Sequence, residues 1–169
     1  MKKLVLHGNV AILAVAMVGL TGCDRDPTEP PGHHLLGTVE ILNRATVPHT
    51  LLATWTHDGG WDTDVLMTLS HGAEDDRTRA SLGARMFTRG GEEIELVRDG
   101  EYTVRYGPYA DPDGVIDMDE ALGLFHGDHV HVYGFHQEGR TGTAQLVFAL
   151  WHGDHADDQT DPIGFTITD

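Results

Sequence analysis

The sequence predicts an all-β domain, with an antiparallel immunoglobulin-like β-sandwich as the favoured architecture and a small β-barrel as the alternative. Short runs in which hydrophobic and polar residues partly alternate recur along the chain. Turn sequences rich in glycine and aspartate, among them HDGG, RGGE and RDGE, separate these runs at regular intervals. Helical patterns are scarce, because only Met118–Phe125 shows one and it is about two turns long.

Nine segments have the patterning of strands. In chain order they are Thr38–Leu42, Thr50–Thr56, Asp64–Ser70, Arg79–Thr88, Glu93–Val97, Glu101–Gly107, His129–Phe135, Thr143–Trp151 and Gly164–Thr168. The turn sequence QEGRTG separates the seventh from the eighth, so we expect those two to pair as a hairpin. Their alternation places five hydrophobic side chains in the core, namely Val130, Val132, Leu146, Phe148 and Leu150.

The N-terminus is typical of a bacterial lipoprotein signal, with an ordinary secretory signal as the alternative. Lys2 and Lys3 precede an apolar run, Val10–Leu20, that is too short to span a membrane comfortably. The run closes with LTGC, which matches the lipobox, and Cys23 is the only cysteine of the chain. We expect Cys23 to carry the lipid that anchors the protein in the cell envelope, on the periplasmic side or at the cell surface. The expected organisation is a signal peptide over 1–22, a lipidated tether rich in proline and acids over 23–34, and a single β-sandwich domain over 35–169.

The net charge and the absence of catalytic motifs argue against two classes of function, nucleic-acid binding and catalysis. The chain holds 27 acidic and 11 basic residues, a formal net charge of −16, and losing Lys2 and Lys3 with the signal makes it −18. Such a surface repels phosphate groups and attracts cations, so we expect no nucleic-acid partner. The sequence contains no G-x-S-x-G, no H-E-x-x-H and no glycine-rich phosphate loop. We therefore expect a protein that is not an enzyme.

The tetrapeptide HGDH occurs twice, at His126–His129 and at His152–His155. The expected hairpin would bring the two copies side by side, and His129 and His131, two residues apart on a strand, would share one face. Imidazole and carboxylate ligands without thiolate suit Zn²⁺, Ni²⁺ or Cu²⁺, with zinc the first candidate. We therefore predict a single metal site that joins the two copies. Its predicted ligands are His129, His131, His152 and His155, with Asp154, Asp128 or His126 as substitutes or as partners that orient the imidazoles.

Two other segments carry candidate ligands. His33 and His34 end the tether and would contribute to the metal site if the first strand begins at the same edge; otherwise they are a flexible pair. The segment DPDGVIDMDE resembles the core of an EF-hand calcium loop, although Tyr109 stands where the first ligand is expected. An acidic turn before a short helix is the alternative for this segment. The calcium hypothesis rests on Asp111, Asp113, Asp117 and Glu120.

These observations favour a membrane-tethered protein that binds a divalent transition metal as a buffer, a carrier or an accessory to a transporter. The competing hypothesis is an immunoglobulin-like module that contacts an envelope protein or a polysaccharide, with histidines that bind nothing specific. A structure distinguishes the two. Metal binding requires at least three histidine or carboxylate side chains around a common point, whereas the module would scatter them and expose an apolar or tryptophan-rich patch.

The C-terminal third resembles small histidine-rich bacterial lipoproteins and secreted proteins that have no activity to carry over. The resemblance rests on an H-x-H strand, a Gly-Thr turn, a strand followed by HGDHAD, and a closing Pro-Ile strand. PGHH after the tether and GARMFTRGGEEIEL also fit this type. The resemblance implies that His129, His131, His152 and His155 belong to one set, and it implies no function for them.

Overall fold

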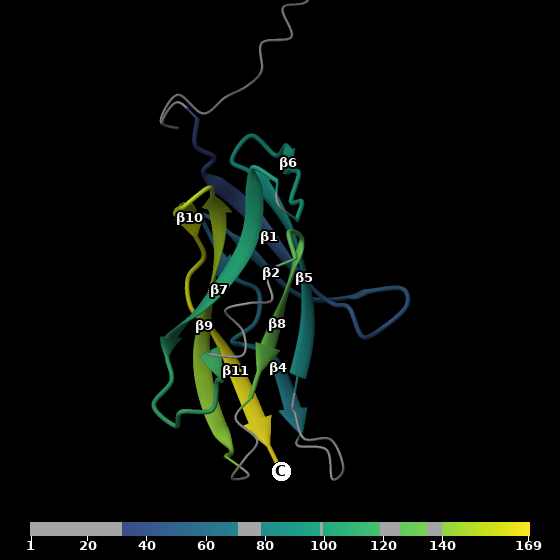
Figure 1. The fold of residues 1–169 in the computed structure, drawn as a ribbon, viewed down its shortest axis with the longest axis vertical. Coiled ribbons are helices and arrows are strands. Elements are labelled where there is room, and N and C mark those ends of the chain that lie inside the picture. Colours follow the sequence, from purple (N-terminus) through teal and green to yellow (C-terminus); the bar gives the residue numbers. More distant parts are fainter. Residues whose placement is uncertain (1–31, 71–78, 99, 119–125, 135–139) are drawn as a thin grey trace, which may run out of the picture.

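The computed structural model describes residues 32–70, 79–98, 100–118, 126–134 and 140–169 (Figure 1). These residues form eleven β-strands, and no helical element occurs among them. The predicted helix Met118–Phe125, the signal peptide and Cys23 fall wholly or almost wholly outside the described residues. The strands are β1 (Leu36–Asn43), β2 (Thr50–Thr56), β3 (Gly60–Trp61), β4 (Val65–Ser70), β5 (Arg79–Thr88), β6 (Glu93–Ile94), β7 (Tyr102–Ala110), β8 (His129–Tyr133), β9 (Gly142–His152), β10 (His155–Gln159) and β11 (Ile163–Thr168).

The strands form two sheets. The first has the order β3-β2-β1-β5-β6, and β8 pairs with β5 beside β6. In the second, β9 is central: β7 follows one of its edges, while β10 and β11 share the other. β11 also pairs with β4 in parallel orientation, so the second sheet is mixed rather than wholly antiparallel as the sequence predicted.

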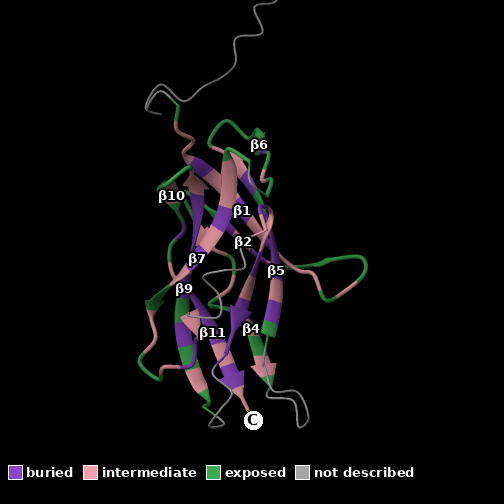
Figure 2. Cartoon of the chain, viewed as in Figure 1, coloured by how far each residue is buried: buried purple, intermediate pink, exposed green. Residues whose placement is uncertain are grey.

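A single hydrophobic cluster lies between the sheets and draws on both of them (Figure 2). Val130 and Val132 of β8 are at most 1% exposed, and Leu146, Phe148 and Leu150 of β9 are fully buried. The five core residues predicted from strand alternation are therefore confirmed. Full burial of side chains of this size stabilises the fold by about 1.5–3 kcal/mol each.

The predicted hairpin between β8 and β9 is wrong. β8 pairs antiparallel with β5 in the first sheet, with His131 opposite Ser81, and β9 belongs to the second sheet. β8 and β9 each have one hydrophobic face. That face can be buried in the core equally well whether the strand belongs to the first sheet or to the second, so the alternation of residues does not decide between the sheets. The chain between them therefore passes from one sheet to the other, and residues 135–139 of this connection lie outside the described residues.

The tryptophans of the WTHDGGWDTD segment contribute to packing. Trp55 lies opposite Trp61 across β2 and β3 and is only 4% exposed. The Trp55 indole N–H donates to the Asp161 carboxylate at 3.1 Å, and the Trp61 N–H donates to the Asp161 carbonyl at 2.8 Å. With both N–H groups engaged in this way, the tryptophans do not form an exposed stacking platform.

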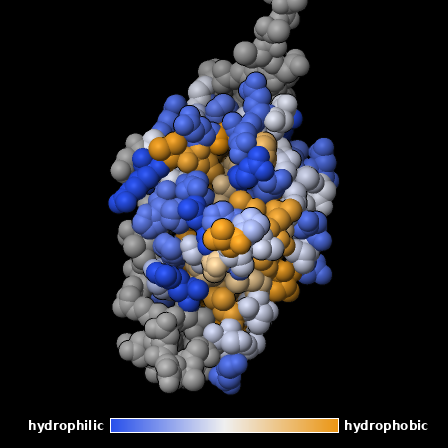
Figure 3. Space-filling view, turned by 90° about the vertical axis from the view of Figure 1, so that its right-hand side faces the viewer, coloured by the Kyte–Doolittle hydropathy of each residue, from blue (hydrophilic) through white to orange (hydrophobic). Residues whose placement is uncertain are grey.

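The turn between β1 and β2 projects from the body of the domain (Figure 1). At this turn Val47 is 95% exposed, and Leu51, at the start of β2, is 50% exposed. Figure 3 views the molecule from that side and shows small groups of hydrophobic side chains among hydrophilic ones. Within the described residues, no helix is long and apolar enough to cross a membrane.

Candidate metal centres

Each HGDH tetrapeptide is a tight turn that brings its own two histidines together. In the second copy, His152 ends β9 and lies directly opposite His155, the first residue of β10. In the first copy, the His126 N–H donates to the His129 carbonyl at 3.2 Å. The second residue of both turns is a glycine with positive φ, +83° at Gly127 and +57° at Gly153, a conformation that glycine adopts at little cost.

The aspartate of each copy orients the last histidine of that copy. The Asp128 carboxylate lies 2.8 Å from Nδ1 of His129, and the Asp154 carboxylate lies 3.1 Å from Nδ1 of His155. An imidazole that donates from Nδ1 carries its lone pair on Nε2, which is then available to a metal ion. These are the contacts that the predicted role of Asp128 and Asp154 as orienting partners requires.

The two HGDH tetrapeptides belong to two separate groups of potential ligand atoms rather than to one. The first group, called the carboxylate site below, consists of His33, His152, His155 and Asp157. The second, called the three-histidine site, consists of His126, His129 and His131. Within each group, one ligand atom from every residue lies within 4.8 Å of the others. The predicted single site of His129, His131, His152 and His155 is thus divided, because β8 and β9 belong to different sheets.

β7 separates the two groups. Tyr102 of β7 pairs with His152 of β9 along one edge of the strand. The N–H of Val104, two residues further on, donates to the Gly127 carbonyl at 2.8 Å. The two HGDH turns therefore flank β7 from opposite edges, near one end of the strand.

Asp157 is the centre of the carboxylate site. Its Oδ1 lies 2.7 Å from His33 Nδ1, 3.2 Å from His155 Nε2 and 3.6 Å from His152 Nδ1. Four ligands bound tetrahedrally to a zinc ion at about 2.0–2.1 Å lie roughly 3.3 Å from one another. The three distances from Asp157 Oδ1 bracket this value, and all four ligand atoms lie within 4.8 Å of one another, so the group has the approximate dimensions of a zinc site.

The ligand atoms of the carboxylate site are held by neighbouring groups. Asp157 Oδ2 accepts the backbone N–H of His34 at 3.1 Å. Nε2 of His152 lies 3.4 Å from the Glu101 carboxylate, which leaves Nδ1 of the same ring facing Asp157. That Nδ1 is buried and has no hydrogen-bond partner. Such outer contacts fix the orientation of ligands in metal sites.

The electrostatic surroundings of the carboxylate site favour a cation. The Asp157 side chain is fully buried, and among the described residues its ion-pair partners are the three imidazoles alone. Glu101 and Asp154 add two further carboxylates at the rim. A buried carboxylate needs a compensating positive charge, from protonated imidazole or from a metal ion.

The three-histidine site differs from the carboxylate site because its three imidazole rings contact one another and no carboxylate belongs to the group. The His126 and His129 rings stack at 4.6 Å between centroids, and His131 meets them edge-on at 5.3 and 5.5 Å. Nδ1 of His131 is buried without a hydrogen-bond partner. His129 and His131 lie on one face of β8, as the H-x-H spacing predicted.

Burial and arginine side chains favour the neutral forms of His131 and His126 in the three-histidine site. Burial, with Arg79 as the next cause, lowers the pKa of His131 to about 4. Burial also lowers the pKa of His126, and His129, Arg98 and Arg44 add to this effect. Neutral imidazole is the form that binds metal ions.

The acidic segment after β7 is a turn in the structure. Both carboxylate oxygens of Asp111 accept backbone N–H groups, from Val115 at 2.9 Å and from Ile116 at 3.0 Å. The Asp113 carboxylate accepts the N–H of Thr143. Among the described residues, Asp111, Asp113 and Asp117 form no metal-binding group, and Glu120 lies outside those residues. The acidic turn accounts for the contacts of Asp111 and Asp113 without calcium.

Sequence reasoning missed Asp157 and considered His33 only conditionally. His33 reaches the site because the carboxylates of Asp157 and Asp158 bind the backbone of the segment that enters β1, through the N–H groups of His34 and Leu36. The signal for Asp157 was its spacing: His155 and Asp157 are two apart and face the same side of β10. The segment HADDQ is so polar that it did not have the pattern of a strand.

Comparison of the chain with protein-family models, with curated proteins and with solved structures finds no match. The resemblance to histidine-rich lipoproteins therefore stays a prediction, and function must be argued from the two sites themselves.

Proposed function

We propose that this protein is a cell-envelope lipoprotein that binds a divalent transition metal ion, zinc first among them, as a buffer, a carrier or an accessory protein without enzymatic activity. The observation that carries the proposal is the fully buried Asp157 carboxylate, with a ring nitrogen of each of three histidines within 3.6 Å of its Oδ1. Three nitrogens and one oxygen are a ligand set that zinc accepts in tetrahedral geometry.

The membrane anchor and the immunoglobulin-like sandwich are parts of the same proposal. LTGC with Cys23 supports the anchor, and two sheets around one core support the sandwich. A lipid anchor would hold the domain at a membrane surface. The acidic surface there would raise the local concentration of cations.

Four protein ligands, one of them a carboxylate, favour storage or transfer of the ion over catalysis. A closed set of four protein ligands leaves no position for a substrate, whereas zinc enzymes keep one position open. The ligands come from the segment before β1 and from β9 and β10, so the bound ion would join two regions of the chain that are more than 100 residues apart.

The test is a calorimetric titration of the full chain, purified without a polyhistidine tag, with Zn²⁺, Ni²⁺ and Cu²⁺. We expect tight zinc binding that His155→Ala or Asp157→Asn weakens by at least about 10–100-fold, the loss that even outer-shell changes cause. His49→Ala is the matched control, because this histidine is exposed and, within the described part of the chain, its ring bonds the carbonyl of Thr46.

Two results would refute the proposal: no zinc binding below millimolar concentration, or equal affinity in the variants and the control. In either case the competing hypothesis of an envelope interaction module would replace it. Affinity is also expected to fall between about pH 7 and pH 5, because protons compete with the metal for several imidazoles.

A further inference from the structure

We propose that the three-histidine site is a second metal site, distinct from the carboxylate site, which binds a divalent ion of the copper or zinc type together with a small anion. This inference does not require the carboxylate site to bind metal. It rests on the ligand geometry of His126, His129 and His131 and on the arginines around them.

Three imidazoles provide an incomplete coordination shell. Their ligand atoms lie within 4.8 Å of one another, and the group contains no carboxylate. Divalent zinc or copper takes at least four ligands, so one position is left for a ligand that the protein does not supply. The carboxylate site, in contrast, supplies four ligands of its own.

The imidazoles are held in place before any ion binds. The HGDH turn fixes His126 against His129, and β8 carries His131 on the same face. Asp128 binds Nδ1 of His129 at 2.8 Å and is itself held by Arg44 at 2.7 Å. This chain from arginine to aspartate to histidine is an outer shell of the kind that tunes metal sites.

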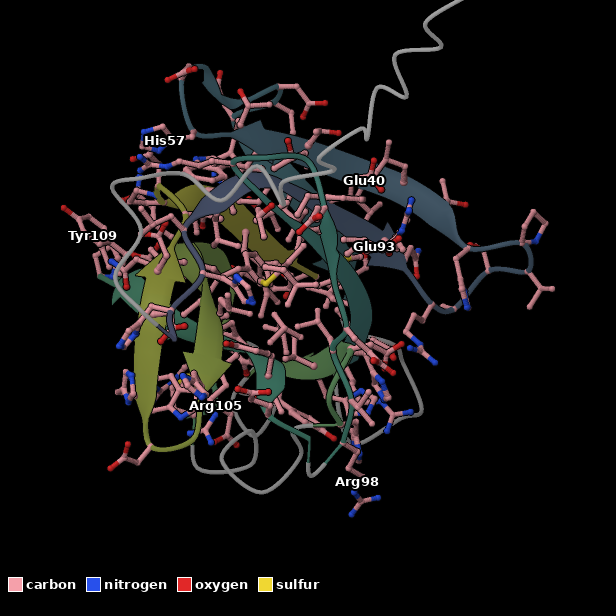
Figure 4. All side chains as sticks on the ribbon, turned by 90° about the horizontal axis from the view of Figure 1, so that it is seen from above. Glu40, His57, Glu93, Arg98, Arg105 and Tyr109 are labelled. Atoms are coloured by element: carbon pink, nitrogen blue, oxygen red, sulfur yellow. The ribbon has the colours of Figure 1, made fainter. Side chains whose placement is uncertain are left out.

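The positive charge nearby determines what the fourth ligand is. Nη1 of Arg44 lies 3.2 Å from Nδ1 of His129, and Arg98 acts electrostatically on His126 as Arg79 does on His131. Figure 4 shows Arg98 at the periphery of the molecule, on the opposite side from His57. Asp128 offsets the charge of Arg44, with which it forms an ion pair, so Arg79 and Arg98 supply the remaining positive charge. A divalent ion on three neutral ligands keeps its full charge of +2, which these two arginines repel. An anion in the open position lowers that charge and is attracted by the same side chains.

The experiment uses Cu²⁺ as the metal and azide as the anion, because azide bound to copper produces a charge-transfer absorption band. The starting protein is the full-length His155→Ala variant, in which the carboxylate site has lost a ligand. We expect it to bind one Cu²⁺ per chain and to develop the band on addition of azide. Adding His131→Ala should weaken copper binding by at least about 10–100-fold and abolish the band, while adding His49→Ala should change neither.

Two further variants separate the two sites and the two parts of the proposal. His131→Ala alone should still bind Cu²⁺ at the carboxylate site, because four protein ligands are present there. Arg79→Gln in the His155→Ala background should retain copper, because Arg79 acts on His131 through its charge. It should weaken azide binding by about 3–10-fold, as expected for one partly screened charge. Circular dichroism checks that each variant folds, and His126→Gln replaces any variant of His131 that does not.

The outcomes are distinct. Absence of stoichiometric Cu²⁺ binding in His155→Ala refutes the second site, even if zinc binds tightly at the carboxylate site. Copper binding that is insensitive to His131→Ala or His126→Gln places the ion elsewhere and refutes it too. Copper binding without an azide band, or azide affinity unchanged by Arg79→Gln, refutes the anion as the fourth ligand.

Discussion

At the scale of single residues, the repeated HGDH motif encodes a local structure rather than half of a shared site. Its glycine allows the turn, its aspartate orients the last histidine, and the turn places the first histidine beside the last. The motif then needs further ligands from outside itself. His131 supplies one in the first copy, and His33 and Asp157 supply two in the second.

The two glycines of the motif differ in their surroundings, which gives a matched pair of variants. A Cβ on Gly127 would overlap the backbone of Val97 and Arg98, whereas a Cβ on Gly153 meets nothing within 4 Å. Both have positive φ, which costs alanine about 1–2 kcal/mol. We expect Gly153→Ala to destabilise the fold by about that amount and Gly127→Ala by clearly more, measured by urea unfolding. Equal losses would show that the turn around Gly127 relaxes freely.

His131 makes the stability of the metal-free protein depend on pH. Burial and Arg79 lower its pKa from 6.5 to about 4, so between these values the unfolded chain binds more protons than the folded one. Stability from this group is complete above about pH 6.5 and is lost as the pH falls toward 4. We expect the melting temperature, measured in a chelator, to fall over this window, and less steeply in His131→Gln. An unchanged slope in the variant would assign the effect to other groups.

At the scale of elements, the strands were predictable and their partners were not. The predicted bounds of β2 and β5 agree with the structure, and those of β1, β4, β9 and β11 differ by at most two residues at either end. β10 was missed because HADDQ contains no alternating hydrophobic residues. Its position depends on pairing with β9 and on carboxylate contacts to the segment before β1.

The assignment of β8 and β9 to different sheets explains the error in the site. Alternation specifies which face of a strand is buried, but it does not specify which sheet the strand joins. The sequence therefore placed His129 and His131 on the correct face of β8, and combined them wrongly with His152 and His155. His129 and His131 stay together because they share one strand, while His152 and His155 stay together because they share one turn.

Surface ion pairs between elements illustrate contacts that add little to the fold. Arg85 of β5 lies between Glu40 of β1 and Glu93 of β6, at 2.9 and 2.8 Å, and Figure 4 shows both glutamates on the same side of the molecule. The hydrogen bond to Glu93 is the largest cause that raises the pKa of Arg85, and the same bond lowers the pKa of Glu93. Arg85 and Glu93 are exposed and Glu40 is partly exposed, and ion pairs this open to solvent add little to stability.

β9 should be sensitive to truncation, because neighbouring strands pair along both of its edges. Phe148 at its centre is fully buried, so Phe148→Ala is expected to cost about 3–5 kcal/mol. Leu51→Ala is the control, because Leu51 is 50% exposed and surface changes usually stay within about 0.5 kcal/mol. Urea unfolding followed by tryptophan fluorescence measures both, and comparable losses would contradict the burial of β9.

At the scale of the whole molecule, the location of the protein should depend on Cys23. Cys23 is the single cysteine and stands at the end of LTGC. If it carries the anchor, Cys23→Ser should lose acyl labelling and move from the membrane fraction to the soluble fraction. A variant that stays with the membrane would refute lipidation at this residue.

Zinc binding at the carboxylate site should also increase the thermal stability of the whole domain. A zinc ion at the carboxylate site would bind the folded chain alone, because its ligands are distributed from His33 to Asp157. At a free concentration 100 times the dissociation constant, such binding adds about 2.7 kcal/mol. For a chain of this size that corresponds to roughly 5–10 °C in melting temperature.

We expect zinc to raise the melting temperature by this amount in the full chain and in His49→Ala. His33→Ala should show a much smaller rise at the same zinc concentration, because it removes the ligand that joins the segment before β1 to β10. If His33→Ala gained as much as the full chain, the ion would not be connecting the beginning of the domain to its end.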